Sequence, residues 1–159
     1  MLSAPHRIYL PLALTLLGAC GGIDGLGGSA AMKPGEDCLR CHQANGRATF
    51  PTFSVAGTIF GAADAPPDEG LSQAEILVTD ATGKQLTLRS NGVGNFYTAE
   101  PLQPPLQVAA QWGRVRMTML EPPPSGACNS CHQVPGPQVT AGFAAPPGRI
   151  FVPTTQGGP

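Results

Sequence analysis

Two copies of one short motif could carry chemistry in this sequence. Residues 38–42 read CLRCH and residues 128–132 read CNSCH, so both have the form C-x-x-C-H. This spacing is the attachment signature of c-type haem. The two thiols can add to the two vinyl groups at one porphyrin edge, and the next imidazole can then reach the iron. The sequence therefore predicts thioether bonds at Cys38, Cys41, Cys128 and Cys131, and iron ligation by His42 and His132.

Other chemistry is open to paired cysteines. A single C-x-x-C pair can form a disulfide or a thioredoxin-like redox centre, and two pairs together can hold zinc. The histidine count favours haem. The chain has three histidines, and the two that follow His6 each come directly after a C-x-x-C pair. A four-cysteine zinc site needs no histidine at that offset, so we expect two covalently attached haems c.

Since both of these histidines are used as proximal ligands, any second protein ligand of either iron must be a different kind of residue. Methionine is a common choice. Met117 and Met119 precede Cys128 by eleven and nine residues and alternate on a predicted strand, so both side chains point to one face. We predict them as metal ligands of the second haem. The alternative is that this face is simply core, with methionine filling gaps.

The first motif has a weaker methionine candidate. Met32 lies six residues before Cys38, and so short a chain would have to wrap around the porphyrin edge. Lys33 and Lys84 are outside options, and a five-coordinate iron open to a small ligand is another. Ligation by histidine and methionine would raise the reduction potential above that of a haem with two histidines.

The elements that must position these motifs are short strands. Residues 53–120 alternate apolar and polar side chains, with turn signals at short spacing. Residues 80–84 and 91–95 are predicted turns, with Gly83 at a left-handed position. Trp112 is expected in the core. The predicted strands are Phe53–Phe60, Ala74–Asp80, Gln85–Ser90, Asn95–Glu100, Leu106–Gln111 and Arg114–Leu120.

Three segments of this region, 55–60, 79–84 and 91–97, resemble the carboxypeptidase regulatory-like, transthyretin-like β-sandwich. The resemblance covers about 70 residues and implies a binding or spacer module without catalysis. We therefore predict a mainly β chain, with a small antiparallel β-sandwich flanked by two irregular or short-helical C-x-x-C-H segments. The whole chain resembles small exported dihaem cytochromes. The two haem segments should meet at one edge of the sandwich, with Ile150–Val152 closing that edge.

The N-terminus has the pattern of an export signal. His6 and Arg7 precede an apolar run over residues 8–19, which is shorter than the roughly 20 residues that span a bilayer. The following Cys20 completes a segment that resembles a bacterial lipobox, which implies lipidation of Cys20 and an outer-membrane lipoprotein facing the periplasm or the cell surface. The alternative is an ordinary signal peptide. The expected division is 1–19 signal peptide, 20–34 tether, 35–50 first haem segment, 51–121 sandwich, and 122–159 second haem segment with a C-terminal strand.

Net charge and the motifs present favour some classes of function over others. Nine Lys and Arg against ten Asp and Glu give a net charge of −1, so we expect no nucleic-acid partner. We find no serine–histidine–aspartate set, paired carboxylate motif or phosphate loop. We therefore expect an electron-transfer protein and not an enzyme, held at a membrane through Cys20 and serving unidentified redox partner proteins. The alternatives are a haem-bearing sensor or binding module for polysaccharide or protein, and a small haem enzyme such as a peroxidase.

Overall fold

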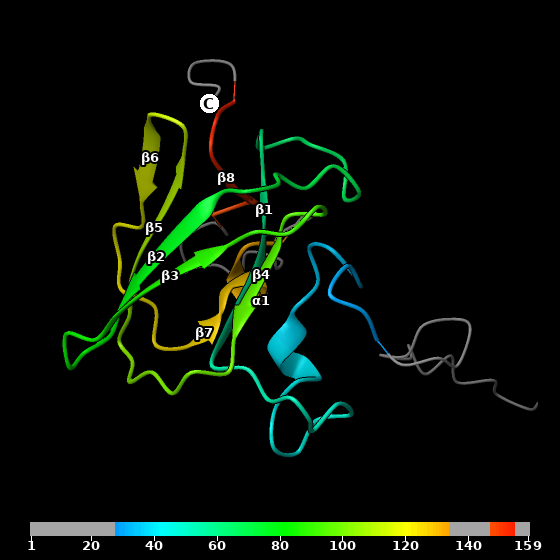
Figure 1. Ribbon diagram of the computed structural model, residues 1–159, viewed down its shortest axis with the longest axis vertical. Helices are drawn as coiled ribbons and strands as arrows, with labels where there is room; N and C mark the ends of the chain where they lie inside the picture. The colour runs from blue at the N-terminus through cyan, green and yellow to red at the C-terminus, as the bar shows by residue number, and fades with distance from the viewer. Residues whose placement is uncertain (1–27, 134–146, 155–159) are drawn as a thin grey trace, which may run out of the picture.

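The computed structural model describes residues 28–133 and 147–154 (Figure 1). This part of the chain is mainly β, with eight strands in two sheets and two single helical turns. No helix in these two ranges is long and apolar enough to cross a membrane. The predicted signal peptide and Cys20 lie outside the described residues. The elements in chain order are η1 (Cys38–Arg40), β1 (Val55–Phe60), β2 (Glu75–Thr79), β3 (Gln85–Arg89), β4 (Asn95–Thr98), β5 (Gln107–Trp112), β6 (Val115–Thr118), β7 (Gly126–Ala127), α1 (Cys128–Cys131) and β8 (Ile150–Phe151).

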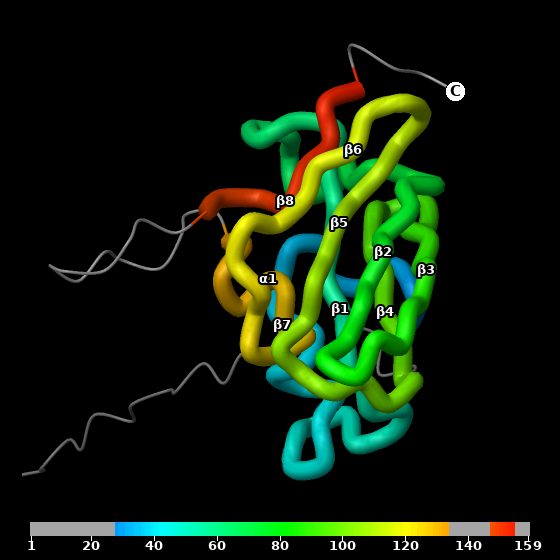
Figure 2. Tube along the Cα trace, turned by 90° about the vertical axis from the view of Figure 1, so that its left-hand side faces the viewer, coloured from blue at the N-terminus to red at the C-terminus, as the bar shows by residue number. Residues whose placement is uncertain are grey.

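The strands form two four-stranded layers. One sheet has the order β3-β2-β5-β6 and is antiparallel throughout. The other is built around β1, which pairs with β4 on one side and with both β7 and β8 on the other. In Figure 1 the η1 segment lies on the outer side of the β1–β4 layer, away from β2, β3 and β5. Figure 2 shows β7, α1 and β8 following one another along the edge of the molecule.

The core lies between the two sheets and explains the alternating sequence. In β2 the side chains of Ile76 and Val78 are buried, while those at 75, 77 and 79 are only half-buried. Full burial of one such aliphatic side chain contributes about 1.5–3 kcal/mol. Trp112 is half-buried and packs against this core, as expected. The buried core cluster comprises Val55, Ile59, Ala74, Ile76, Val78, Phe96, Leu106, Ala110 and Val152.

Strand β1 differs from the others because all six of its residues are buried. A strand in a two-layer sandwich usually exposes alternate residues to water. Here the outer face of β1 is covered as well: the backbone N–H of Gly35 donates to Thr58 Oγ1 at 2.7 Å, and the guanidinium of Arg149 lies 4.3 Å from the centre of the Phe60 ring. The segments that flank the sandwich in sequence thus form a third layer over β1.

All six predicted strands are present, with most ends trimmed by one or two residues and β5 running one residue further, to Trp112. The predicted turns are confirmed, with positive φ at Gly83 (87°) and Gly94 (80°). The expected C-terminal strand is also found, as β8 beside β1. The prediction of a purely antiparallel sandwich is wrong in one respect, because β7 and β8 run parallel to β1. Strand β7 was not predicted, since two small residues carry no periodic signal.

Candidate functional site

Each C-x-x-C-H motif folds as a single helical turn. The first forms η1 and the second forms α1. In both, the histidine N–H donates to the carbonyl of the first cysteine, at 2.9 Å for His42 and 3.0 Å for His132. This i to i+4 bond brings the two cysteines and the histidine of a motif onto adjoining positions of one turn.

The two turns share finer contacts as well. The glutamine after each histidine, Gln43 or Gln133, donates through Nε2 to the carbonyl two residues before that histidine, at 3.3 Å in both motifs. The first thiol of each motif, at Cys38 or Cys128, lies 3.6 or 3.5 Å from the carbonyl oxygen two residues before it. The sequence similarity around the motifs therefore extends to a repeated local structure.

Both histidines are oriented by a backbone carbonyl. Nδ1 of His42 lies 2.9 Å from the carbonyl oxygen of Pro51, and Nδ1 of His132 lies 2.9 Å from that of Gly148. A carbonyl oxygen can only accept, so Nδ1 carries the proton in each neutral ring and Nε2 keeps its lone pair. Histidines that bind metals commonly donate their other ring nitrogen in this way, which fixes the tautomer and the ring direction. Each motif thus presents one Nε2 suited to bind iron.

Aromatic packing further fixes the first histidine. The His42 ring stacks on Phe53 with centroids 4.3 Å apart, and Phe53 stacks on Tyr97 at 4.7 Å. Phe53 stands just before β1 and Tyr97 is on β4, so this ring stack ties the first motif to the outer face of the sheet.

A buried asparagine holds the second motif against β1. Asn129, between the two cysteines, is 1% exposed, and its Oδ1 accepts from the backbone N–H of Thr58 at 2.7 Å. Its Nδ2 donates to the carbonyl of His132 at 3.1 Å. On this edge, β7 pairs with residues 55–56 of β1 and β8 with residues 59–60. Asn129 occupies the gap between these two strands, so α1 is inserted into the edge of the sheet.

The same threonine also holds the first motif. Thr58 Oγ1 accepts from Gly35 N and donates to Asn95 Oδ1, each at 2.7 Å. Asn95 in turn donates through Nδ2 to the carbonyl oxygens of Ala30 and Met32, at 3.2 and 2.9 Å. The backbone N–H and the side-chain hydroxyl of Thr58 on β1 therefore hold the segments of the second and the first cysteine motif, respectively. Sequence reasoning missed Thr58, Asn95 and Asn129, although polar residues within apolar strands were a signal for buried hydrogen bonds.

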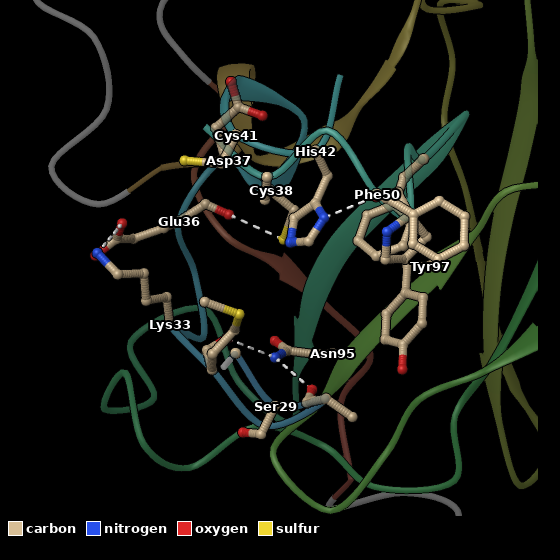
Figure 3. Close-up of a pocket in the computed structure, with 16 residues that line it drawn as sticks. Ser29, Lys33, Glu36, Asp37, Cys38, Cys41, His42, Phe50, Asn95 and Tyr97 are labelled. Atoms are coloured by element: carbon tan, nitrogen blue, oxygen red, sulfur yellow. Dashed lines mark hydrogen bonds and ion pairs between the residues drawn. The ribbon is translucent and has the colours of Figure 1, made fainter. Parts of the chain in front are cut away.

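A pocket of about 320 Å³ opens beside the first motif (Figure 3). That volume lies at the lower end of the range for small-molecule sites. Figure 3 shows His42 and Cys38 on one side of the pocket and Ser29 and Asn95 on the opposite side. Its lining is Gly28, Ser29, Ala30, Met32, Lys33, Glu36, Asp37, Cys38, Cys41, His42, Ala48, Phe50, Pro51, Phe53, Asn95 and Tyr97.

The first thiol of each motif has a raised pKa. Burial raises the pKa of Cys128 to about 12, and burial together with the carboxylate of Asp37 raises that of Cys38. Thioredoxin-like centres instead need a lowered thiol pKa. The two motifs lie near each other, because η1 contacts β7, the strand that directly precedes α1. Cys41 is disulfide-bonded in this structure, so a thioether at this sulfur requires reduction of that bond first.

The methionines and lysines considered as second ligands of the irons lie in different parts of the structure. Met117 on β6 and Met119 just after it are exposed, at 44% and 37%, and neither lines the pocket of the first motif. Their face is therefore not core, and their assignment to the second haem stays a prediction. Met32 and Lys33 do line that pocket. Lys84 does not line it, and instead its ammonium lies 3.1 Å from the carboxylate of Glu100.

In the part of the chain that the structure describes, donors for a bare metal ion do not converge. Within residues 28–133 and 147–154 no group of three or more His, Cys, Asp or Glu side chains is placed to hold one ion. A haem, by contrast, needs a single imidazole and two thiols from each motif, and the orientation of both histidines fits this demand. Comparisons with family models, with curated proteins and with solved structures gave no match.

Proposed function

We propose that this protein is a dihaem c-type cytochrome that transfers electrons. One haem is attached at Cys38 and Cys41 with His42 as iron ligand, and the other at Cys128 and Cys131 with His132. The observation that carries the proposal is the shared orientation of the two histidines, each with Nδ1 2.9 Å from a backbone carbonyl oxygen and Nε2 left for iron. The haem supplies one-electron redox chemistry, and the chain holds and orients it.

The protein's own groups support a carrier over the other uses of paired cysteines. Zinc would need the four cysteines to converge, and no such cluster is found in the described part of the chain. A dithiol redox centre would need thiols more acidic than usual, whereas the pKa values of Cys38 and Cys128 are raised.

The closeness of the motifs supports electron exchange between the haems. The turn of the second motif contacts β1, and η1 contacts both β1 and β7. A methyl group added at Gly57 of β1 would lie 2.9 Å from Cβ of Cys128, which shows how tightly the second motif packs on this strand. Two redox centres mounted on one rigid strand keep a constant separation, which suits passage of electrons through the molecule.

The setting of this carrier also forms part of the proposal. The lipid on Cys20 would tether the protein to the outer membrane, and the sandwich would act as the spacer that its resemblance to the carboxypeptidase regulatory-like, transthyretin-like family implies. In this arrangement the sandwich performs no catalysis. Its contribution is to fix both haem-binding turns on β1 and β4.

Expression in a host with the c-type haem maturation system tests the proposal. Mass spectrometry should find the mass of two haems on the polypeptide, and the purified protein should have a Soret band. Replacing Cys128 and Cys131 together by serine should remove one haem, and replacing Cys38 and Cys41 should remove the other. Colourless protein with the mass of the bare polypeptide would refute the proposal.

A further inference from the structure

We infer that the thioether sulfur of Met32 is the second axial ligand of the haem attached at Cys38 and Cys41. The inference rests on the proposed function and assigns a residue to one of its two sites. Met32 and His42 line the same pocket, although the motif comes six residues later in the chain. A neutral, soft thioether opposite an imidazole is an established way to ligate haem iron.

The backbone before the first motif doubles back, which answers the objection that so short a segment cannot wrap around a porphyrin. Met32 N donates to the carbonyl of Ser29 at 3.1 Å, and Glu36 N donates to that of Lys33 at 3.2 Å, so two successive turns precede the motif. Lys33 and Gly35 both have positive φ, 46° and 83°. For a lysine this conformation is uncommon, and such residues concentrate at functional sites.

Hydrogen bonds fix Met32 to the wall of the pocket that faces the motif. Figure 3 shows Ser29 and Asn95 opposite His42 and Cys38. The backbone of Met32 bonds to both of these opposite residues, through its N–H to Ser29 and through its carbonyl to Asn95 Nδ2 at 2.9 Å. Asn95 is only 4% exposed, so this anchor is buried in the sheet.

The side chain of Met32 is also confined. It is half-buried, and its sulfur packs over Gly28, where an added Cβ would lie only 2.6 Å from Sδ. A glycine at that position leaves room for the thioether within the pocket. The carbonyl of Ala30 accepts from Asn91 Nδ2 at 2.6 Å, which fixes the chain two residues before the methionine.

Competing donors in this pocket are already engaged. The ammonium of Lys33 lies 3.3 Å from the carboxylate of Glu36, and a protonated amine has no lone pair for iron. The carboxylate of Asp37 accepts from Leu39 N at 3.1 Å as the cap of η1. Among the residues that the structure describes, Met32 is the one methionine in the pocket lining, since Met117 and Met119 do not contribute to it.

The decisive experiment compares Met32→Leu with Met117→Leu and Met119→Leu in the full-length, haem-loaded protein. The readouts are the number of covalent haems, the methionine-to-iron charge-transfer band of the ferric protein, and the reduction potential of each haem. Met32→Leu should keep two haems, lose the band of one haem and lower that haem's potential. In the background with Cys128 and Cys131 replaced by serine, where only the first haem remains, the band should vanish entirely. The two control variants should leave the first haem unchanged.

The outcomes separate the inference from the proposed function. Two haems with an unchanged band in Met32→Leu would overturn the Met32 assignment and leave the cytochrome intact. Absence of haem from the wild-type protein would overturn both. A band altered by Lys33→Gln and not by Met32→Leu would also contradict the assignment. Should Met32→Leu fail to accumulate, Met32→His should give a stable protein whose first haem has a two-nitrogen spectrum, and an unchanged spectrum there would refute the inference.

Discussion

The backbone N–H of Thr58 donates to the side-chain oxygen of Asn129 at 2.7 Å, across 71 positions of sequence. In a continuous sheet this donor of β1 would bond to a neighbouring strand. Here β7 ends before Thr58 and β8 begins after it, and a side chain from the second cysteine motif takes the vacant place. This hydrogen bond therefore fixes the second cysteine motif at the edge of β1, in the place where a neighbouring strand would otherwise pair.

Asn129→Ala should lower the free energy of unfolding by about 1–3 kcal/mol, because it leaves a buried N–H of β1 without an acceptor. Urea unfolding followed by circular dichroism measures the change. Asn45→Ala deletes the same side chain at an exposed position and should change stability by less than about 0.5 kcal/mol. Equal effects of the two variants would show that the bond to Thr58 has no special importance.

Gly57→Ala should destabilise the protein by about 1–3 kcal/mol through overpacking. The added methyl group would lie 2.7 Å from Cζ of Phe96 and 2.9 Å from Cβ of Cys128, so β4 or the second motif must shift. Gly92→Ala is the matched control, since an added Cβ at Gly92 meets nothing within 4 Å. Thermal unfolding of both variants decides the matter, and a Gly57→Ala protein as stable as the control would contradict the packing described.

Asp80 should make stability depend on pH in the acid range. The hydroxyl of Thr82 and the backbone N–H of Gln103 donate to its carboxylate and hold its pKa at about 2, below the ordinary 3.8. Because the folded-state pKa is lowered, this contribution is fully present above the ordinary pKa and is lost as the pH falls through about 2.

Asp80→Asn should therefore be less stable than wild type at pH 7, with a difference that shrinks between about pH 4 and pH 2. Urea midpoints measured across this range test the expectation. Asp64→Asn, at an exposed loop position, controls for loss of a surface carboxylate. A difference that stays constant down to pH 2 would exclude the assigned role of Asp80.

Phe53→Ala should destabilise the first motif because the ring stacks on both His42 and Tyr97. Two aromatic pairs at about 0.5–1.5 kcal/mol each predict a loss of about 1–3 kcal/mol beyond that of buried area. Leu120→Ala, at a side chain that is 96% exposed, should have little effect. Proteolysis near residues 38–53 should accelerate in Phe53→Ala alone, and unaltered cleavage there would argue against the ring stack as the support of His42.

The fold was largely predictable because its strands follow simple local rules. Alternation at Ile76 and Val78 and the turn glycines Gly83 and Gly94 are encoded in adjacent residues, so period and turn chemistry locate β2 to β4. The parallel pairing of Gly126 with Val55 depends on residues far apart in sequence, and nothing local indicates it.

For the candidate site, the sequence located the two cysteine motifs but not the groups that orient their histidines. The spacing of cysteines and histidines indicates haem directly, whereas the carbonyls of Pro51 and Gly148 that orient the histidines come from loops with no motif. The longer chain between the methionines and the motif favoured Met117 and Met119, as ligands of the second haem, over Met32 for the first. Met32 nevertheless lines the pocket beside the first motif, because two left-handed residues turn the chain back toward that motif.

Pairing of Ile150 with Ile59 has a consequence for how the chain matures. A growing polypeptide cannot complete the edge of β1 until about ninety further residues have followed it, and such distant pairings form slowly. Until then Asn129 and the rest of α1 cannot be enclosed between β7 and β8. Docking of β8 is therefore a late step, which closes the second cysteine motif into the edge of the sheet.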